Sequence, residues 1–264
     1  MYFSAGLLLT LWVPSWYAMR TLVIHAHPDP TSFSRSLLNN VVKGLQQQDA
    51  DVRVRSLYRY EDNAHECYNR RTFNPITTQR DLHLYNKLNK MPDVTLALNT
   101  LKASIETRLQ VQLNENPTDL DWKYPETHAF DDDIIDAVDD LRWCTSIVFV
   151  YPTWWYGMPA ILKGYFDRVM IPGVAFHYNR NRQYRVIPGL PHIKKIGIVT
   201  TYGAPNLVVK MHGDHGRRLV THSLAPHCAL GCRVVHKGLY SIDRSTETQR
   251  AAFLENVMNS YRYF

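Results

Sequence analysis

The sequence lacks the glycine-rich signatures of two common nucleotide-binding turns. Neither GxGxxG, which opens the dinucleotide-binding Rossmann unit, nor GxxxxGK(S/T), which cradles phosphates in P-loop proteins, occurs in the first strand-to-helix turn, HAHPDPTSFSRS at 25–36. Cysteine is scarce as well, because the four cysteines form neither a CxxC pair nor the framework of a small disulfide-stapled domain. We therefore exclude both motif-based modes of phosphate binding and expect a reducing compartment, the cytoplasm.

A metal centre is not indicated either. The histidines and cysteines of the C-terminal part are His212, His215, His222, His227, Cys228, Cys232 and His236. Structural zinc sites use paired ligands at short spacing, and these residues do not show that spacing. Because Cys232 and His236 also fall on an expected strand, we predict that no metal is bound.

Runs of like charge are absent. The formal net charge is +6, but the basic residues are dispersed, and no Lys/Arg stripe or RNA-binding signature is present. Nucleic acid is therefore not an expected partner, and the charge weakly favours a small anionic ligand. The apolar fraction of 45% is that of an ordinary globular protein, and 264 residues suffice for one α/β domain with an insertion.

Residues 1–18 are apolar but lack the basic start of a signal peptide. A spanning helix needs roughly 20 apolar residues, and Pro14 interrupts this shorter stretch. We interpret 1–18 as an extension, because a first strand follows directly after Met19. Membrane contact is not expected, although an anchoring or targeting role for the extension stays open.

Short runs rich in β-branched residues alternate with apolar residues at helical spacing. The expected strands are Thr21–His25, Val52–Leu57, Ile147–Tyr151, Lys195–Thr201 and Cys232–Leu239. The expected helices are 35–48, 132–143, 160–169, 209–224 and 246–264. This alternation predicts an α/β fold: a flavodoxin-like, doubly wound, five-stranded parallel sheet with helices on both faces.

Residues 58–128 interrupt the alternation with a long polar region. We expect one helix in it, near 93–114, and a surface excursion for the remainder. The chain contains no repeats and no low-complexity linker, so 19–264 is predicted to be a single domain that carries this insertion.

The first strand-to-helix turn places hydroxyl groups directly before a helix. Thr31, Ser32 and Ser34, together with the unpaired N–H groups and the dipole of a helix N-terminus, predict an anion site. The alternative, that one of them serves only as the N-cap, stays open at this point. His27 is expected to face the same place, which favours phosphate binding.

Two later turns add aromatic and polar groups. The third strand runs into YPTWWYG at 151–157, and the fourth into TTYGAP at 200–205. Aromatic side chains beside a strand are often part of the core, so the third turn by itself leaves that alternative open. Because parallel strands end at one edge of a sheet, the three turns together predict a site for a flat ring with a phosphate tail, such as a flavin.

The sequence at these turns resembles the flavodoxin-like NAD(P)H:quinone oxidoreductases, the family of DT-diaphorase and the modulator-of-drug-activity-type reductases. The resemblance extends over roughly residues 20–260, and its third segment is the most specific. The segments that carry it are AHPDPTSFSRS at 26–36, FNPITTQRD at 73–81, YPTWWYGMPAILKGYFDRVMIPGVAFHY at 151–178 and TTYG at 200–203.

The resemblance implies a set of cofactor-binding residues. Those at the flavin phosphates would be His27, Ser32, Phe33, Ser34 and Ser36. Those at the isoalloxazine ring would be Pro152, Thr153, Trp154, Trp155 and Tyr156, and those at its polar edge Thr200, Thr201, Tyr202 and Gly203. Arg250 matches an arginine that meets the adenine end of FAD, which favours FAD over the alternative, FMN.

Substrate-binding and catalytic residues are implied in the same way. Phe176 and Tyr178 match aromatic residues that face nicotinamide and quinone in the mammalian enzymes, and Trp155 would line the same place. The residues expected to take part in catalysis are Tyr156, Tyr178 and His212. His212 stands for a histidine proposed to manage charge on the reduced flavin, but no tyrosine lies at the spacing of its partner. Tyr202 replaces a glycine of the mammalian turn.

The implied activity is that of a flavin-dependent NAD(P)H:quinone oxidoreductase. NAD(P)H would give a hydride through the flavin to a quinone or similar flat acceptor, and ping-pong kinetics follow because both substrates use one site. Backbone N–H groups after Thr153 and at 201–203 would stabilise the negative charge. Relatives are homodimers with interfacial active sites, and the helix at 160–170 is expected to supply part of that surface unless it only covers the sheet.

Two other functions stay open. One is a regulatory flavoprotein subunit that binds a transporter, as relatives do on potassium-efflux systems, and the apolar extension 1–18 suits it. The other is a flavodoxin-like electron carrier. Such carriers are usually acidic, so the charge of +6 counts against that function.

Overall fold

The computed structural model describes residues 19–58, 132–178 and 186–264. The extension 1–18 and nearly all of the predicted insertion 58–128 lie outside the described residues. So do the helix expected near 93–114 and the FNPITTQRD segment at 73–81.

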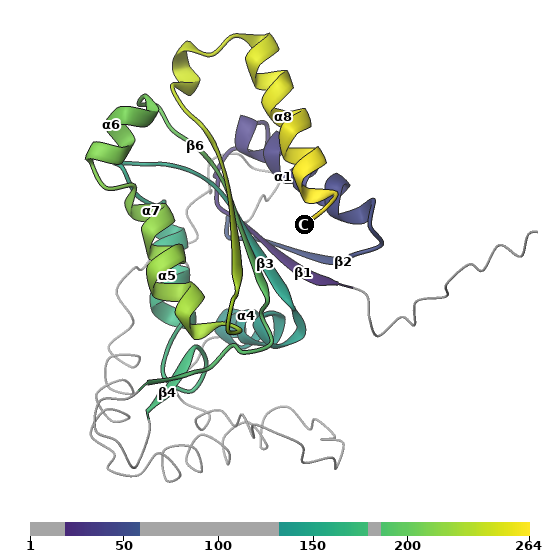
Figure 1. Cartoon of the computed structure of the whole chain (residues 1–264), viewed down its shortest axis with the longest axis vertical. Coiled ribbons are helices and arrows are strands. Elements are labelled where there is room, and N and C mark those ends of the chain that lie inside the picture. Colours follow the sequence, from purple (N-terminus) through teal and green to yellow (C-terminus); the bar gives the residue numbers. More distant parts are fainter. Residues whose placement is uncertain (1–18, 59–131, 179–185) are drawn as a thin grey trace, which may run out of the picture.

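Five parallel strands form one sheet in the order β2-β1-β3-β6-β7 (Figure 1). The strands are β1 (Arg20–His25), β2 (Asp51–Ser56), β3 (Ser146–Pro152), β6 (Lys195–Thr201) and β7 (Arg233–Leu239). The central strand β3 is buried at every residue, as a parallel sheet covered on both faces requires, and its apolar sequence SIVFVYP meets that requirement. This order is the doubly wound one that the sequence predicts, and every predicted strand boundary lies within one residue of the observed one.

Helices cover both faces of the sheet. They are α1 (Phe33–Gln46), α4 (Asp132–Trp143), α5 (Ala160–Val169), α6 (Asn206–Met211), α7 (His215–Arg218), the π-helical turn η2 (Leu219–Leu224), the 3₁₀ turns η3 (Ala225–His227) and η4 (Ile242–Arg244), and α8 (Glu247–Tyr261). Figure 1 shows α1 and α8 side by side on one face, and α4 and α5 belong to the other. No helix of the described ranges is long and apolar enough to cross a membrane.

The single helix predicted over 209–224 is wrong. Gly213 and Asp214 have positive φ angles of 89° and 44°, which no right-handed α-helix contains. The chain therefore ends α6, turns at these two residues and begins α7 in a new direction.

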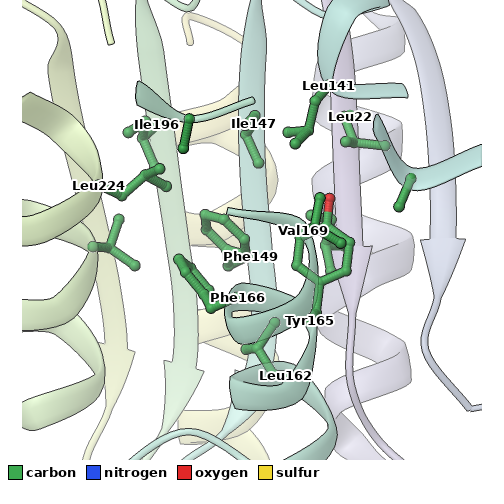
Figure 2. Packing of buried hydrophobic residues seen from close by; sticks show 14 of the residues in the cluster. Leu22, Leu141, Ile147, Phe149, Leu162, Tyr165, Phe166, Val169, Ile196 and Leu224 are labelled. Atoms are coloured by element: carbon green, nitrogen blue, oxygen red, sulfur yellow. The ribbon is translucent and has the colours of Figure 1, made fainter. Parts of the chain in front are cut away.

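The larger core cluster lies between the sheet and α4 and α5. Phe149 of β3 packs on Phe166 of α5, with ring centroids 5.2 Å apart, and Leu162, Tyr165 and Val169 point to the same side of the sheet (Figure 2). All four of these α5 side chains are buried within the chain. Because these four side chains cover the sheet, a second subunit would contact α5 through its outer side, where Ala160 and Lys163 are exposed, and the dimer surface expected on this helix stays a prediction.

A short antiparallel hairpin was not predicted. It consists of β4 (Phe176–Tyr178) and β5 (Val186–Pro188). The Gly189 N–H after β5 donates to Ala175 O, and the chain then enters β6 within six residues, so the hairpin lies at the amino end of the sheet. Figure 1 shows β4 at the opposite end of the molecule from α6, which follows β6.

Candidate functional site

The turns after β1, β3 and β6 meet at the carboxyl edge of the sheet, because these three strands are neighbours. The Thr153 N–H donates to Thr201 O at 2.8 Å, and the hydroxyls of Thr153 and Thr200 lie 3.1 Å apart. The His27 and Trp154 rings meet edge to face, with centroids 6.2 Å apart. The structure thus brings together predicted residues from all three turns, and Pro152, buried at the end of β3, starts the middle one.

The first turn ends in a capped helix. Ser32 is the N-cap of α1, and its Oγ accepts from the Arg35 N–H at 3.2 Å. The next two N–H groups, of Phe33 and Ser34, donate to no other residue of the described part of the chain. Such groups at the positive end of a 14-residue helix suit an anion.

The predicted hydroxyls of this turn divide between two roles. Ser34 is buried, and its Oγ lies 3.2 Å from His25 Nε2, so this hydroxyl points into the protein and only the N–H of Ser34 is placed for an anion. Thr31 is tied by its N–H and Oγ1 to Asp29 Oδ1, each at 2.7 Å. Ser36 lies half-buried in the first turn of α1, and Phe33 packs on the core beside that helix.

His27 lies at this turn as a neutral ring. Its Nδ1 lies 3.0 Å from the Asp29 N and 3.2 Å from Asp29 O, and the tautomer in which Nδ1 accepts from this N–H carries the ring proton on Nε2. Burial lowers the pKa of His27, and the backbone and charge of Asp29 oppose that change only in part. A neutral Nε2–H is a donor suited to a phosphate oxygen.

The turn after β3 is strained. Trp154 and Gly157 exchange two backbone hydrogen bonds of 3.0 Å, and the two residues between them, Trp155 and Tyr156, have φ of 50° and 60°. Two positive φ angles in a two-residue hairpin are typical of a type I′ turn, which normally takes Asn and Gly. Bulky aromatic residues adopt this conformation at a cost of about 1–2 kcal/mol each, and strain of that size concentrates at functional sites.

The strained turn also presents unused donors. The N–H groups of Trp155 and Tyr156 donate to no other residue of the described ranges, and the Trp155 side chain is 97% exposed. By contrast, the N–H of Thr153 is bound to Thr201 O and that of Tyr202 to Leu239 O. The unused donors of the aromatic turn follow Thr153, as expected, whereas the N–H of Tyr202, one of the donors expected at 201–203, is bound to Leu239 O.

The fourth turn departs from its predicted role at Tyr202. This side chain is 2% exposed and points inward, with its hydroxyl donating to Asp214 Oδ1 at 2.9 Å. Its backbone O accepts from the Ile242 N–H, so neither its side chain nor its backbone is available to a flavin ring. Thr200 and Thr201 are buried, whereas Gly203 and Pro205 are exposed.

His212 joins the site from the segment after α6. Its exposed ring stacks on Tyr156, with centroids 4.1 Å apart and planes 23° from parallel. Two of the predicted catalytic residues, Tyr156 and His212, are thus in contact at the carboxyl edge. The sequence does not predict this contact, because the two residues lie 56 positions apart and no local pattern connects them.

Phe176 and Tyr178 do not join them. Both lie in β4 at the amino end of the sheet, where the Phe176 ring is 5.5 Å from that of His227, and the Tyr178 ring is outside the described part of the structure. Arg250, in the first turn of α8, donates to Ser245 O at 2.8 Å. The segment that holds Ser245 follows Ile242, which is bound to Tyr202, so Arg250 lies near the carboxyl edge.

Acid should destabilise the protein through His25, which is fully buried behind the first turn. Burial, and secondly the charge of Arg35, lowers the pKa of His25 from 6.5 to about 4. The unfolded chain takes up this proton near pH 6.5, so the free energy of unfolding should fall as the pH drops from about 6.5 to about 4. Urea denaturation near pH 7 and near pH 5 measures the fall. This fall in the free energy of unfolding should be smaller in His25→Asn than in the wild type, and it should be unchanged in His222→Asn, a control at an exposed histidine. Equal falls in the wild type and both variants would contradict the role of His25.

Metal ligands do not gather in the described ranges. No group of three or more His, Cys, Asp or Glu residues there is placed to hold a metal ion. Cys144 and Cys228 are buried, and burial raises the pKa of the Cys144 thiol to about 12, so it is not a reactive thiolate.

The fold and the edge site define a doubly wound α/β protein with its functional residues in the strand-end turns. A family model described by the flavodoxin-like fold matches residues 19–227, and the chain belongs to that family. This confirms the fold and the family expected from the sequence.

The curated proteins that the chain is similar to are named as NAD(P)H-type or ribosyldihydronicotinamide dehydrogenases. The NAD(P)H dehydrogenase (quinone) 1 of Cavia porcellus is 26% identical over 197 residues, which cover 75% of this chain and 58% of that protein. The chain spans about half the length of the curated relatives it matches.

Two solved structures share the fold. One is an NAD(P)H:quinone oxidoreductase from Methanothermobacter marburgensis, at a TM-score of 0.61 and 19% identity, covering 93% of this chain and 96% of that one. The other is an FMN-dependent NADH-azoreductase from Bacillus anthracis in complex with FMN, at 0.60 and 13%, covering 93% and 98%.

Proposed function

We propose that the protein is a flavin-dependent NAD(P)H:quinone oxidoreductase that works by a ping-pong mechanism. The observation that carries this proposal is the convergence of three strand-end turns, linked by the contacts of Thr153 with Thr200 and Thr201 and of His27 with Trp154. The names of the curated relatives support the same reaction class.

The residues present fit a flavin. The unused N–H groups of Phe33 and Ser34, with the His27 ring, suit its phosphate, and the exposed Trp155 suits its flat ring. A bound flavin supplies the hydride-transfer chemistry, and the protein supplies binding and electrostatics. The N–H groups of Trp155 and Tyr156 would stabilise negative charge there, because donors held in place need no reorganisation during the reaction.

His212 and Tyr156 would wall the face used by both substrates. Their stacked rings offer a flat aromatic surface at the carboxyl edge on which nicotinamide or quinone can lie. Alternate binding of the donor and the acceptor at one surface gives ping-pong kinetics.

We propose FAD as the flavin because Arg250 lies near the carboxyl edge, where the resemblance implies the adenine end of FAD. Its guanidinium is held by Ser245 O, so it is already oriented. Denaturing the yellow protein and separating the released flavin by chromatography distinguishes FAD from FMN, and FMN alone would overturn this choice.

A homodimer would complete the site. Phe176 lies at the amino end of its own chain and cannot face Trp155 of the same chain, but a second copy could place it there. Exposed apolar residues mark both ends: Trp155, Leu207 and Met211 follow β3 and β6, and Val186 and Ile187 lie on the hairpin. In a symmetric dimer, the carboxyl edge of each copy would contact the hairpin of the other, so this contact would form twice and bury the exposed apolar residues of both surfaces.

Purified protein should carry flavin and oxidise NADH or NADPH rapidly when menadione or benzoquinone is present. Initial rates measured at several fixed quinone concentrations should give parallel double-reciprocal lines, as ping-pong kinetics require. Flavin-loaded protein that oxidises neither nucleotide with any acceptor would contradict the enzymatic function. Intersecting lines would leave the activity but exclude the ping-pong mechanism.

A further inference from the structure

A buried polar cluster lies directly behind the candidate site. The Tyr202 hydroxyl is 2.9 Å from Asp214 Oδ1 and 3.1 Å from His236 Nε2, and Tyr240 stacks on the Tyr202 ring with centroids 4.6 Å apart. Arg217 Nη1 lies 4.0 Å from Asp214 Oδ2. Asp214 is 9% exposed, so this carboxylate has few water contacts and depends on its protein partners.

The hydrogen bonds of this cluster have one direction. A phenol has one proton, and Tyr202 gives it to Asp214, so His236 Nε2 must donate to the Tyr202 oxygen. Burial, and secondly Arg217, lowers the pKa of His236 to about 4, so a neutral ring with its proton on Nε2 is the form present near pH 7. The result is a chain of donors that runs from His236 through Tyr202 to Asp214.

Asp214 has an unfavourable local conformation in this cluster. Its φ of 44° is left-handed, at a cost of about 1 kcal/mol, and although it is the N-cap of α7 its side chain makes no capping bond. The carboxylate points instead to a residue of the β6 turn. The strained backbone and the missing cap at the start of α7 indicate that the contact between Asp214 and Tyr202 compensates for their cost in stability.

The cluster needs space that a glycine provides. A Cβ at Gly238 in β7 would come within 2.8 Å of Tyr202 Cε2, so only glycine at this position lets the tyrosine ring lie inward. The ring then reaches Asp214, which is only two residues from His212. The three-residue stretch 212–214 is short, so fixing the carboxylate limits where the His212 ring can lie.

We propose that Tyr202 and Asp214 are positioning residues that hold His212 against Tyr156 at the substrate face. The backbone N–H groups of 212–214 all donate to α6, at Val208, Lys210 and Val209, and Asp214 O accepts from the Arg218 N–H of α7. The bond between Tyr202 and Asp214 is the one that joins this segment to the turn after β6. Loss of this bond lets α6 and His212 move together away from the aromatic turn.

The Tyr202→Phe variant tests the pair, with Tyr240→Phe as the matched control. Both remove one phenol oxygen from stacked rings, but only Tyr202 contacts Asp214. The main readout is the proton NMR signal of the His212 ring, assigned with His212→Gln, which the Tyr156 ring should move upfield of the exposed His215 and His222 signals. This shift should be lost in Tyr202→Phe and kept in Tyr240→Phe.

The kinetic readout rests on the proposed oxidoreductase function, whereas the NMR readout does not. In Tyr202→Phe, kcat/KM for the quinone should fall about tenfold, because a hydrogen bond to a charged group is lost, and the flavin content should stay the same. Protein without reductase activity would contradict the proposed function and leave the NMR test intact.

A second pair of variants keeps the test decisive if Tyr202→Phe folds poorly. Asp214→Asn retains an acceptor for Tyr202 and tolerates a positive φ, so it should keep most of the His212 shift, whereas Asp214→Gly tolerates the φ but should lose it. An unchanged His212 signal in Tyr202→Phe or in Asp214→Gly would overturn the proposal, even where thermal stability falls.

Discussion

Replacing Trp155 with alanine is expected to weaken flavin binding about 5- to 150-fold and to leave the unfolding temperature almost unchanged. Stacking of a heterocyclic base on an aromatic side chain contributes about 1–3 kcal/mol, which corresponds to that loss of affinity. The side chain is 97% exposed, so its removal leaves no cavity. Titration of the apoprotein with FAD, followed by fluorescence, measures the affinity.

Trp155→Gly is the matched variant that separates stacking from backbone strain. Residue 155 has φ of 50°, which glycine adopts freely and alanine does not. The glycine variant should therefore be about 1 kcal/mol more stable than the alanine variant, with the same loss of flavin affinity. Intact flavin affinity in both variants would contradict a ring-binding role for Trp155, and equal stabilities would contradict the strain.

The sheet could be predicted because its strands are dictated by local composition. The runs at Lys195–Thr201 and Ser146–Pro152 are apolar and β-branched, and burial on both faces of a parallel sheet requires nothing more specific. Neighbouring strand ends then fix the carboxyl edge, so the meeting of Thr153 with Thr200 follows from topology.

The site details could not be predicted because they depend on distant residues or on backbone strain. The positive φ of Trp155 and Tyr156 occurs without the Asn or Gly that would signal it. The inward direction of Tyr202 depends on Gly238 and Asp214, which no local pattern connects to the TTYG turn. The sequence predicts a phosphate-binding hydroxyl at Ser34, but this hydroxyl is hydrogen-bonded to the buried His25 ring, nine residues earlier in the chain.

Pairs of damaged chains should restore activity to one another if the site is shared between two copies. Trp155→Gly damages the carboxyl edge, and Phe176→Leu damages the hairpin at the amino end while keeping most of its packing. Each variant alone should lose about tenfold or more of its quinone reductase activity. Each mixed dimer has one undamaged site of two, so isolated mixed dimers should show roughly half of the wild-type activity.

The control is a mixture of Trp155→Gly with Tyr156→Ala. Both changes lie on the same turn, so every site of a mixed dimer carries one of them and no activity should return. The variants are combined by co-expression with two different affinity tags, and mixed dimers are isolated through both tags before the assay. Isolated mixed dimers of Trp155→Gly and Phe176→Leu that stay as inactive as either parent would contradict a shared site. A shared site requires a dimer, because the hairpin and the aromatic turn lie at opposite ends of one sheet and only a second chain can bring them together. Failure to isolate any doubly tagged dimer would therefore contradict both the homodimer and the shared site.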